Sequence, residues 1–416
     1  MNFGPKLSSN FISSPYIRKL TLQNNRLVGF EDGTFDGVPN LEYLDLSHNN
    51  LNLNKLFSFG GHQKLKTLIL DYNNAGADNS HPTTTPDYYN YGYHTTENDY
   101  HNRNMNSNFL QIYLMGKFPE LKDLSLRYIN MQSASSGWNY NFPNLYRLDI
   151  SGNKFQKPIH HIFGDILSII KSLILVDTNL TKFGGSSLFK NIQTLNVAHN
   201  NFNLLSYSDC DDDTFCLNNF DNLEYLNISN CAISSIKLDA FKSLVNLLEL
   251  DMSDNQFYEI PDGAFNNLTK LTRLDLSRNK LSGIPIISNL PNLSTLILND
   301  MKTDMISIFM ETELPNLKSL SLQGNNIQYI LENFITNLPM LQELDLSNNH
   351  IETLPVWESS NILSKLYLNH NAIRNFDNIT SVITDSLQIL DIGNNPLKKI
   401  EVKSLKKLSG DAIIIL

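Results

Sequence analysis

A segment of eleven residues recurs along the chain and constrains its fold more than any other feature. Residues 41–51, LEYLDLSHNNL, fit the pattern L-x-x-L-x-L-x-x-N-x-L, which returns at Leu271, Leu341 and Leu387. A short motif repeated at a period of about 24 residues predicts a solenoid, in which each repeat buries its apolar face only against its neighbours. We place fifteen repeats, which start at Ile17, Leu41, Leu65, Leu121, Leu145, Ile170, Ile192, Leu223, Leu247, Leu271, Leu293, Leu317, Leu341, Leu363 and Leu387.

The pattern also predicts the structure inside each repeat. Apolar residues alternate in its x-L-x-L-x part, as they do in a β-strand, so the residues between them face the other way. The Asn at the ninth position is expected to turn inward, where its amide can satisfy the backbone groups of a tight turn. The rest of each repeat returns with apolar anchors such as Phe265. We therefore expect an α/β solenoid with parallel strands on a concave face and irregular or short helical returns on a convex face.

The returns carry a resemblance to a known family. Residues 257–268, FYEIPDGAFNNL, and the 24-residue period resemble the typical subtype of animal extracellular leucine-rich repeats, found in Toll-type receptor ectodomains and in chaoptin-like and Slit-like proteins. The resemblance covers about residues 16–400. It implies a right-handed leucine-rich-repeat horseshoe of about 15 repeats in a single domain, residues 1–416. It also implies a receptor or cell-adhesion role. The cysteine-rich caps of those families do not occur in this sequence.

Four repeats depart from the pattern at the ninth position, where Ile129, Thr178, Cys231 and Met301 replace Asn. Thr and Cys can still hydrogen-bond in the turn, and Cys231 is expected to be buried and unpaired. Ile and Met have no such group, so we expect local irregularity at those two repeats. The simpler interpretation is drift in a tolerant repeat.

Two insertions interrupt the period. Residues 76–118 are rich in Tyr, Asn, Thr and His, a composition that favours a flexible low-complexity segment. This segment has a functional role, as a contact loop or a processing site, or it is a low-complexity expansion that the fold tolerates. Residues 204–219 contain Cys210 and Cys216, which could close a small loop. A disulfide is expected there in an oxidising compartment, and two free thiols in the cytosol.

Charge and motifs exclude several function classes. The formal net charge is -10, whereas nucleic-acid or anionic-membrane binding needs a basic face. We find no phosphate loop, metal-protease helix, nucleophile elbow or kinase motif, so we expect no enzyme, no cofactor and no metal site. The sequence has neither a secretory signal nor a run of about 18 apolar residues. The apolar end at residues 412–416 suggests a fragment of a longer protein, which could itself be membrane-attached.

N-glycosylation sequons would agree with secretion, although an Asn-rich chain contains some by chance. Five candidates occur, at Asn179, Asn227, Asn267, Asn292 and Asn378. Asn227 falls on a strand position of the concave face, where a glycan would exclude a protein interface.

The strand register predicts where a partner would bind. Residues at repeat positions two, three, five, seven and eight should project from the concave face, and aromatic and Arg residues are enriched at binding hot spots. Repeats two to five carry the candidate patch, although Tyr is frequent enough in this chain to cluster by chance. The patch consists of Tyr43, Tyr72, Arg127, Tyr128, Tyr146 and Arg147.

These observations favour a non-catalytic protein-binding module, extracellular or at the cell surface, that binds a protein or glycoprotein ligand. A homodimer is also compatible with them. The alternative is an intracellular leucine-rich-repeat scaffold or regulatory subunit in the cytoplasm, which the lack of a signal peptide in this sequence favours if its N-terminus is complete.

Overall fold

The computed structural model describes residues 6–73, 111–112, 114, 116–134, 136–184, 187–207, 214–281, 287, 289–301, 314–332, 334–357, 362–400, 405, 408 and 410–416. The chain divides into two compact units. Unit 1 is Met1–Asn144 with Gly152–Phe155, and unit 2 is Leu145–Ser151 with Gln156–Leu416. The single domain expected over residues 1–416 stays a prediction. Most of the insertion at 76–118 and the centre of that at 204–219 lie outside the described residues.

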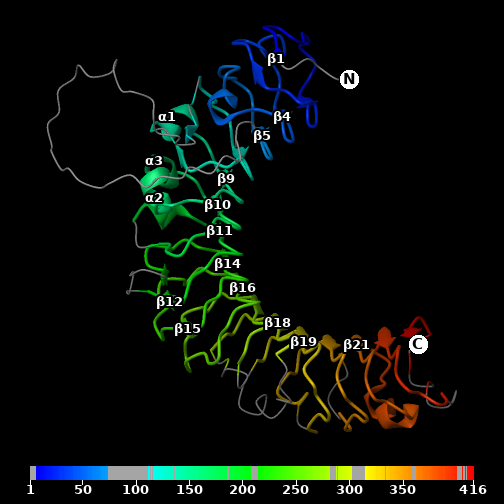
Figure 1. The fold of residues 1–416 in the computed structure, drawn as a ribbon. Helices are drawn as coiled ribbons and strands as arrows, with labels where there is room; N and C mark the ends of the chain where they lie inside the picture. Colours follow the sequence, from blue (N-terminus) through cyan, green and yellow to red (C-terminus); the bar gives the residue numbers. More distant parts are fainter. Residues whose placement is uncertain are drawn as a thin grey trace, which may run out of the picture. The chain divides into compact units, whose positions relative to one another are not determined.

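Within each unit, each repeat contributes one three-residue strand that pairs in parallel with the strand of the next repeat (Figure 1). The pairing follows the repeat register, so that Leu44 opposes both Leu20 and Leu68. The expected parallel-strand solenoid is thereby confirmed. In unit 1 the strand order is β2 (Lys19–Thr21), β4 (Tyr43–Asp45), β5 (Thr67–Ile69) and β7 (Asp123–Ser125).

In unit 2 the described strands of the large sheet follow the same order in space as in sequence. They are β9 (Arg147–Asp149), β10 (Ser172–Ile174), β11 (Thr194–Asn196), β14 (Tyr225–Asn227), β16 (Glu249–Asp251), β17 (Arg273–Asp275), β18 (Thr295–Ile297), β19 (Ser319–Ser321), β20 (Glu343–Asp345), β21 (Lys365–Tyr367), β22 (Ile389–Asp391) and β23 (Ile413–Ile415). The last strand lies beyond the fifteenth repeat placed from the sequence. The repeat pattern did not reveal it because residues 411–416, DAIIIL, do not fit that pattern.

The returns are short and mostly irregular, as expected. In unit 1 they contain the strands β1 (Lys6–Leu7), β3 (Gly29–Phe30), β6 (Gln111–Ile112) and β8 (Ser133–Ala134), the 3-10 helix η1 (Leu53–Lys55) and the helix α1 (Trp138–Asn141). In unit 2 they contain α2 (Ile159–Ile162), α3 (Gly164–Leu167), η2 (Ser187–Asn191), β12 (Leu204–Ser206), β13 (Thr214–Cys216), β15 (Ser235–Ile236) and η4 (Phe376–Val382). The strand β12 pairs with β13 and β15, so the second insertion adds a small parallel sheet among these returns.

The core of each unit lies between the strands and the returns. In unit 1, Leu44 and Leu46 of one repeat are fully buried, and the rings of Phe30, Phe35 and Phe59 pack with centroids 5.1–5.7 Å apart. Burying a Leu or Phe side chain contributes about 1.5–3 kcal/mol. Because each repeat supplies the same few large side chains, the stack gains stability repeat by repeat.

The ninth-position Asn residues form the expected hydrogen-bonded ladder in both units. Asn255 is typical, since its Nδ2 donates to the carbonyls of Ile228, at 2.8 Å, and Met252, at 3.1 Å. Its Oδ1 accepts from the backbone N–H groups of Cys231 and Ile233, both at 3.0 Å. The ladder satisfies backbone groups that a buried turn would otherwise leave unpaired.

The four ladder positions without Asn differ in which hydrogen bonds they keep. The Thr178 hydroxyl and the Cys231 thiol still donate to buried carbonyls, of Leu175 at 2.9 Å and of Val197 at 3.1 Å. Ile129 and Met301 have no side-chain donor, yet their backbone N–H groups still donate to the next Asn in the ladder. The backbone hydrogen bond of the ladder therefore persists at both positions, and only the side-chain bonds are missing there.

Candidate functional site on the strand face

The strand face is the surface formed by repeat positions two, three, five, seven and eight. Its most regular feature is position eight, directly before the ladder residue. In each of the fifteen repeats this residue has a positive φ, between 50° and 72°. In most of these repeats its backbone N–H donates to the next repeat, as Tyr72 does to the Arg127 carbonyl at 2.8 Å. Asn, Asp, His and Gly tolerate this left-handed conformation best.

Three of the fifteen position-eight residues are not of those types: Tyr72, Tyr128 and Arg278. The left-handed conformation costs a residue with an ordinary side chain about 1–2 kcal/mol. The remaining twelve are Asn24, His48, Gly152, Asp177, His199, Asn230, Asp254, Asp300, Gly324, Asn348, His370 and Asn394. Each exception therefore needs a compensating interaction or a functional reason.

Tyr72 and Tyr128 belong to a stacked aromatic column in unit 1. The rings of His48 and Tyr72 lie 4.5 Å apart, and those of Tyr72 and Tyr128 lie 4.9 Å apart, both with planes inclined by 9°. Tyr72 nevertheless keeps 40% of its surface exposed. Gly152 closes the column, because a Cβ at that position would collide with the Tyr128 ring. The column presents ring edges rather than ring faces to solvent.

Arg127, at position seven, lies beside this column. Its Cζ is 5.9 Å from the centroid of the Tyr128 ring, and its Nε is buried without a hydrogen-bond partner among the described residues. Asp71 could have been its counter-ion, but that carboxylate accepts from the Ser125 hydroxyl at 2.6 Å and from the Arg127 backbone N–H at 2.9 Å. Arg127 has no ion pair within the described part of the chain.

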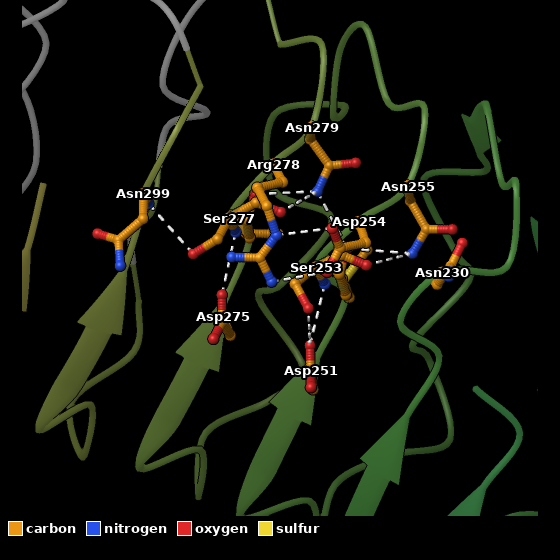
Figure 2. A network of polar contacts seen from close by, with 12 residues as sticks. Asn230, Asp251, Ser253, Asp254, Asn255, Asp275, Ser277, Arg278, Asn279 and Asn299 are labelled. Atoms are coloured by element: carbon orange, nitrogen blue, oxygen red, sulfur yellow. Dashed lines mark hydrogen bonds and ion pairs between the residues drawn. The ribbon is translucent and has the colours of Figure 1, made fainter. Parts of the chain in front are cut away.

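An ion pair offsets the unfavourable left-handed backbone of Arg278 in unit 2 (Figure 2). Its Nε and Nη2 both donate to the Asp254 carboxylate, at 2.6 Å each. This hydrogen bond lowers the pKa of Asp254 and raises that of Arg278. In the same view Asp251 and Asp275 accept from the backbone of Ser253 and Ser277. Burial raises the pKa of Asp275.

The structure brings together only part of the patch expected from the sequence. Tyr72, Arg127 and Tyr128 lie together in unit 1. Tyr43 lies in the same unit, where the Lys19 ammonium is 4.4 Å from its ring centroid. Tyr146 and Arg147 belong to unit 2, and Arg147 pairs with Asp149 at 3.1 Å.

Sequence reasoning missed His48 as part of the column and missed the Asp254–Arg278 pair. Aligning the fifteen repeats by position eight would have revealed both, because that alignment places each residue next to its partner. His160 and His161 pack edge to face at 4.3 Å, and the described residues contain no group of three or more His, Cys, Asp or Glu that could hold a metal ion.

The remaining candidates lie in unit 2. Asn179, Asn267 and Asn292 are exposed, whereas Asn227 and Asn378 are partly buried. Cys231 is free and buried, as expected. Cys216 is disulfide-bonded, while Cys210 lies outside the described residues, so their pairing stays a prediction. None of the described helices has the length and hydropathy needed to cross a bilayer.

Parallel strands at one per repeat, an Asn ladder and Phe-bearing returns define a solenoid repeat protein. The sequence profile described as leucine rich repeat matches residues 15–74, 221–281, 253–302, 291–351 and 315–373, together just over half of the chain. The chain belongs to the leucine-rich-repeat family, and its repeats resemble those of Toll-type receptors.

Three similar proteins illustrate this. Human Toll-like receptor 3 is 25% identical over 264 residues, 62% of this chain, and the chain spans only 24% of that receptor's length. A solved leucine-rich-repeat protein of Leptospira interrogans has a TM-score of 0.61 at 21% identity, covering 98% of this chain and 88% of that one. A chain of the Drosophila Toll–Spätzle complex has a TM-score of 0.58 at 22% identity, covering 69% and 39%. The two solved structures share the fold with this chain.

Proposed function

We propose that the chain is the ligand-recognition part of a non-catalytic receptor or adhesion protein, and that it works outside the cell or at its surface. The observation that carries this is the stack of the exposed Tyr72 on the half-buried Tyr128, kept on the strand face despite an unfavourable backbone conformation. Strained residues that persist at a surface point to a binding role. The likeness to Toll-type repeats supports the same reading, since Toll was solved in complex with Spätzle.

The proposed ligand is a protein or glycoprotein bound on the strand face. Tyr and Arg are enriched at binding hot spots, Tyr because it buries a large amphipathic surface at a low entropic cost and Arg because its guanidinium makes several directed hydrogen bonds. The proposed contacts are Tyr43, Tyr72, Arg127 and Tyr128 in unit 1, with Tyr146 and Arg147 in unit 2.

Chemistry on unit 2 supports the extracellular location. Cys216 is disulfide-bonded, and disulfides persist mainly in oxidising compartments. We propose Cys210 as its partner. Asn179 and Asn267 are exposed acceptors for a glycan. Asn227 is a poor acceptor, because its Nδ2 donates to Asp251 at 3.2 Å and its Oδ1 accepts from the Ser229 hydroxyl at 2.8 Å.

Mass spectrometry of the protein from its native source tests the location. The cells are lysed in guanidinium chloride so that buried free thiols are also blocked, and the protein is digested without reduction. We expect a Cys210–Cys216 cross-link, glycans on Asn179 and Asn267, an unmodified Asn227 and a blocked Cys231. If Cys210 and Cys216 are both blocked and all five sequons are bare, the intracellular scaffold becomes the better reading.

A further inference from the structure

Arg127 differs from the other arginines of the strand face. Arg18, Arg147, Arg273 and Arg278 each approach a carboxylate of the same unit, at N–O distances between 2.6 and 3.8 Å. Arg127 has no such partner among the described residues. A guanidinium whose Nε is removed from water without an acceptor is costly, since an unmet charged donor loses more than a neutral one.

The phenol hydroxyls beside Arg127 are also unused. Neither Tyr72 nor Tyr128 makes a side-chain hydrogen bond within the described part of the chain. Two acidic groups of the neighbouring turns, Asp45 and Asp71, are already hydrogen-bonded, and Asp123 of the Arg127 repeat makes no ion pair with Arg127. The Asp45 carboxylate accepts from the Ser47 backbone N–H at 2.9 Å, and Asp71 is bound by Ser125 and Arg127 as described. Arg127 Nε and the two phenol hydroxyls are therefore donors without an acceptor among the described residues of unit 1.

We propose that Tyr72, Arg127 and Tyr128 form a binding site for a carboxylate side chain carried by an acidic segment of a protein partner. Arg127 pairs with the carboxylate, and the two phenol edges donate to it or to the neighbouring backbone carbonyls. Charge-assisted hydrogen bonds of this kind are about twice as strong as neutral ones. The stack holds both tyrosines in place, so little side-chain freedom is lost on binding. This inference rests on the proposed ligand-recognition role and specifies the chemistry of its ligand.

A polyanion such as nucleic acid or a sulfated glycan is a poorer fit. Such ligands are held by arrays of cations that neutralise several charges along the chain. Here one arginine is unpaired, and Arg18 and Lys66 on the same strand face are both bound to Glu42, at 2.6 and 2.7 Å. Lys19 lies over the Tyr43 ring, which leaves Lys122 as the one further cation of this face in the described part of unit 1 without such a contact. The net charge of -10 adds general repulsion. A single carboxylate, presented by a peptide, matches a single guanidinium better.

The test uses the full chain and a phage-displayed library of random peptides. Enriched peptides are synthesised, and their affinity is measured by fluorescence anisotropy for the wild type, Arg127→Met and the double variant Tyr72→Asn/Tyr128→Asn. Met keeps most of the aliphatic stem of Arg127, and Asn suits the left-handed backbone, so both variants should melt as the wild type does by circular dichroism. Arg273→Met is the matched control, because that arginine already has a carboxylate partner.

We expect enrichment of Asp- and Glu-containing peptides that bind both site variants about tenfold more weakly or worse, and bind Arg273→Met unchanged. Failure to enrich acidic peptides, or equal binding to Arg127→Met, would overturn the proposal. So would tighter binding of heparin or single-stranded RNA that is lost in Arg127→Met, since the partner would then be a polyanion. None of these outcomes affects the mass-spectrometric test of location, so the two proposals can fail separately.

Discussion

Gly152 covers one face of the Tyr128 ring so closely that even a methyl group at Gly152 has no room. The two residues occupy the same repeat position in consecutive repeats, and both have a left-handed backbone, with φ of 51° at Tyr128 and 72° at Gly152. The contact explains why the aromatic column ends where it does. It also makes the two positions energetically dependent on each other, which can be measured.

Gly152→Ala should destabilise the chain by about 2–4 kcal/mol, of which about 1 kcal/mol comes from the left-handed backbone and the rest from the clash with Tyr128. Tyr128→Ala removes the ring. Adding Gly152→Ala to that variant should therefore lower the free energy of unfolding only by the cost of the left-handed backbone, about 1 kcal/mol. Urea denaturation of the two single variants and the double variant gives the coupling, expected at about 1–3 kcal/mol. Additive effects would show that the two residues are not in contact.

Asn255→Ala should lower the free energy of unfolding by about 3 kcal/mol. The substitution leaves the Ile228 carbonyl and the backbone N–H groups of Cys231 and Ile233 without their partner, whereas the Met252 carbonyl keeps the bond from Asn279 Nδ2 at 3.0 Å. Each unmet buried group costs about 1–3 kcal/mol before relaxation. Thermal or urea denaturation provides the measurement. The adjacent exposed Gln256→Ala is the control and should stay within about 0.5 kcal/mol of the wild type. Equal effects of the two variants would mean that the ladder adds no stability.

Protonation of His62 should destabilise unit 1 in mild acid. Its Nε2 lies 3.1 Å from the Val38 carbonyl and its Nδ1 accepts from the Lys64 backbone N–H at 3.3 Å, which requires the neutral ring. Burial lowers the pKa of His62 below its ordinary value of 6.5. The unfolded chain therefore binds the proton more readily, and stability is lost as the pH falls below about 6.5 towards the lowered pKa.

The pH dependence of unfolding between pH 8 and pH 5 checks this expectation. His62→Gln should flatten that dependence, whereas the exposed His350→Gln should leave it as in the wild type. A wild-type stability that is constant over this range would show that His62 accepts a proton without cost.

The Cys231 thiol should resist alkylation in the folded chain. Burial raises its pKa to about 12, so almost none of the reactive thiolate forms at mildly alkaline pH. Iodoacetamide followed by peptide mapping should leave Cys231 unmodified in the native protein and modify it after unfolding in guanidinium chloride. Rapid labelling of the native protein would mean that the ladder opens locally in this repeat.

The sequence predicted the strands because their alternation is local. The pattern at Leu41 places residues 43–45 on a strand, and the structure has β4 at Tyr43–Asp45. The sequence could not predict β23, because Ile413–Ile415 joins the sheet by packing on β22 without the flanking repeat pattern. The division into two units was also invisible, since the repeat register passes through residues 145–155 unchanged.

The candidate site was predictable in composition but not in contacts. Tyr72 and Tyr128 were found because they fall on exposed strand-face positions. The stack between them needed the structure, because the insertion between their repeats hides that β5 and β7 are neighbours. The unpaired state of Arg127 depends on the position of the Asp71 carboxylate, which no spacing rule gives.

The left-handed residue before each ladder position is the single variable side chain along one line of the strand face. One side chain per repeat sets the chemistry of that line, from the stacked rings of Tyr72 and Tyr128 to the ion pair of Asp254 and Arg278. None of these side chains belongs to the apolar core. Specificity in such an array can therefore be rewritten one repeat at a time, provided that the neighbours above and below are changed to match.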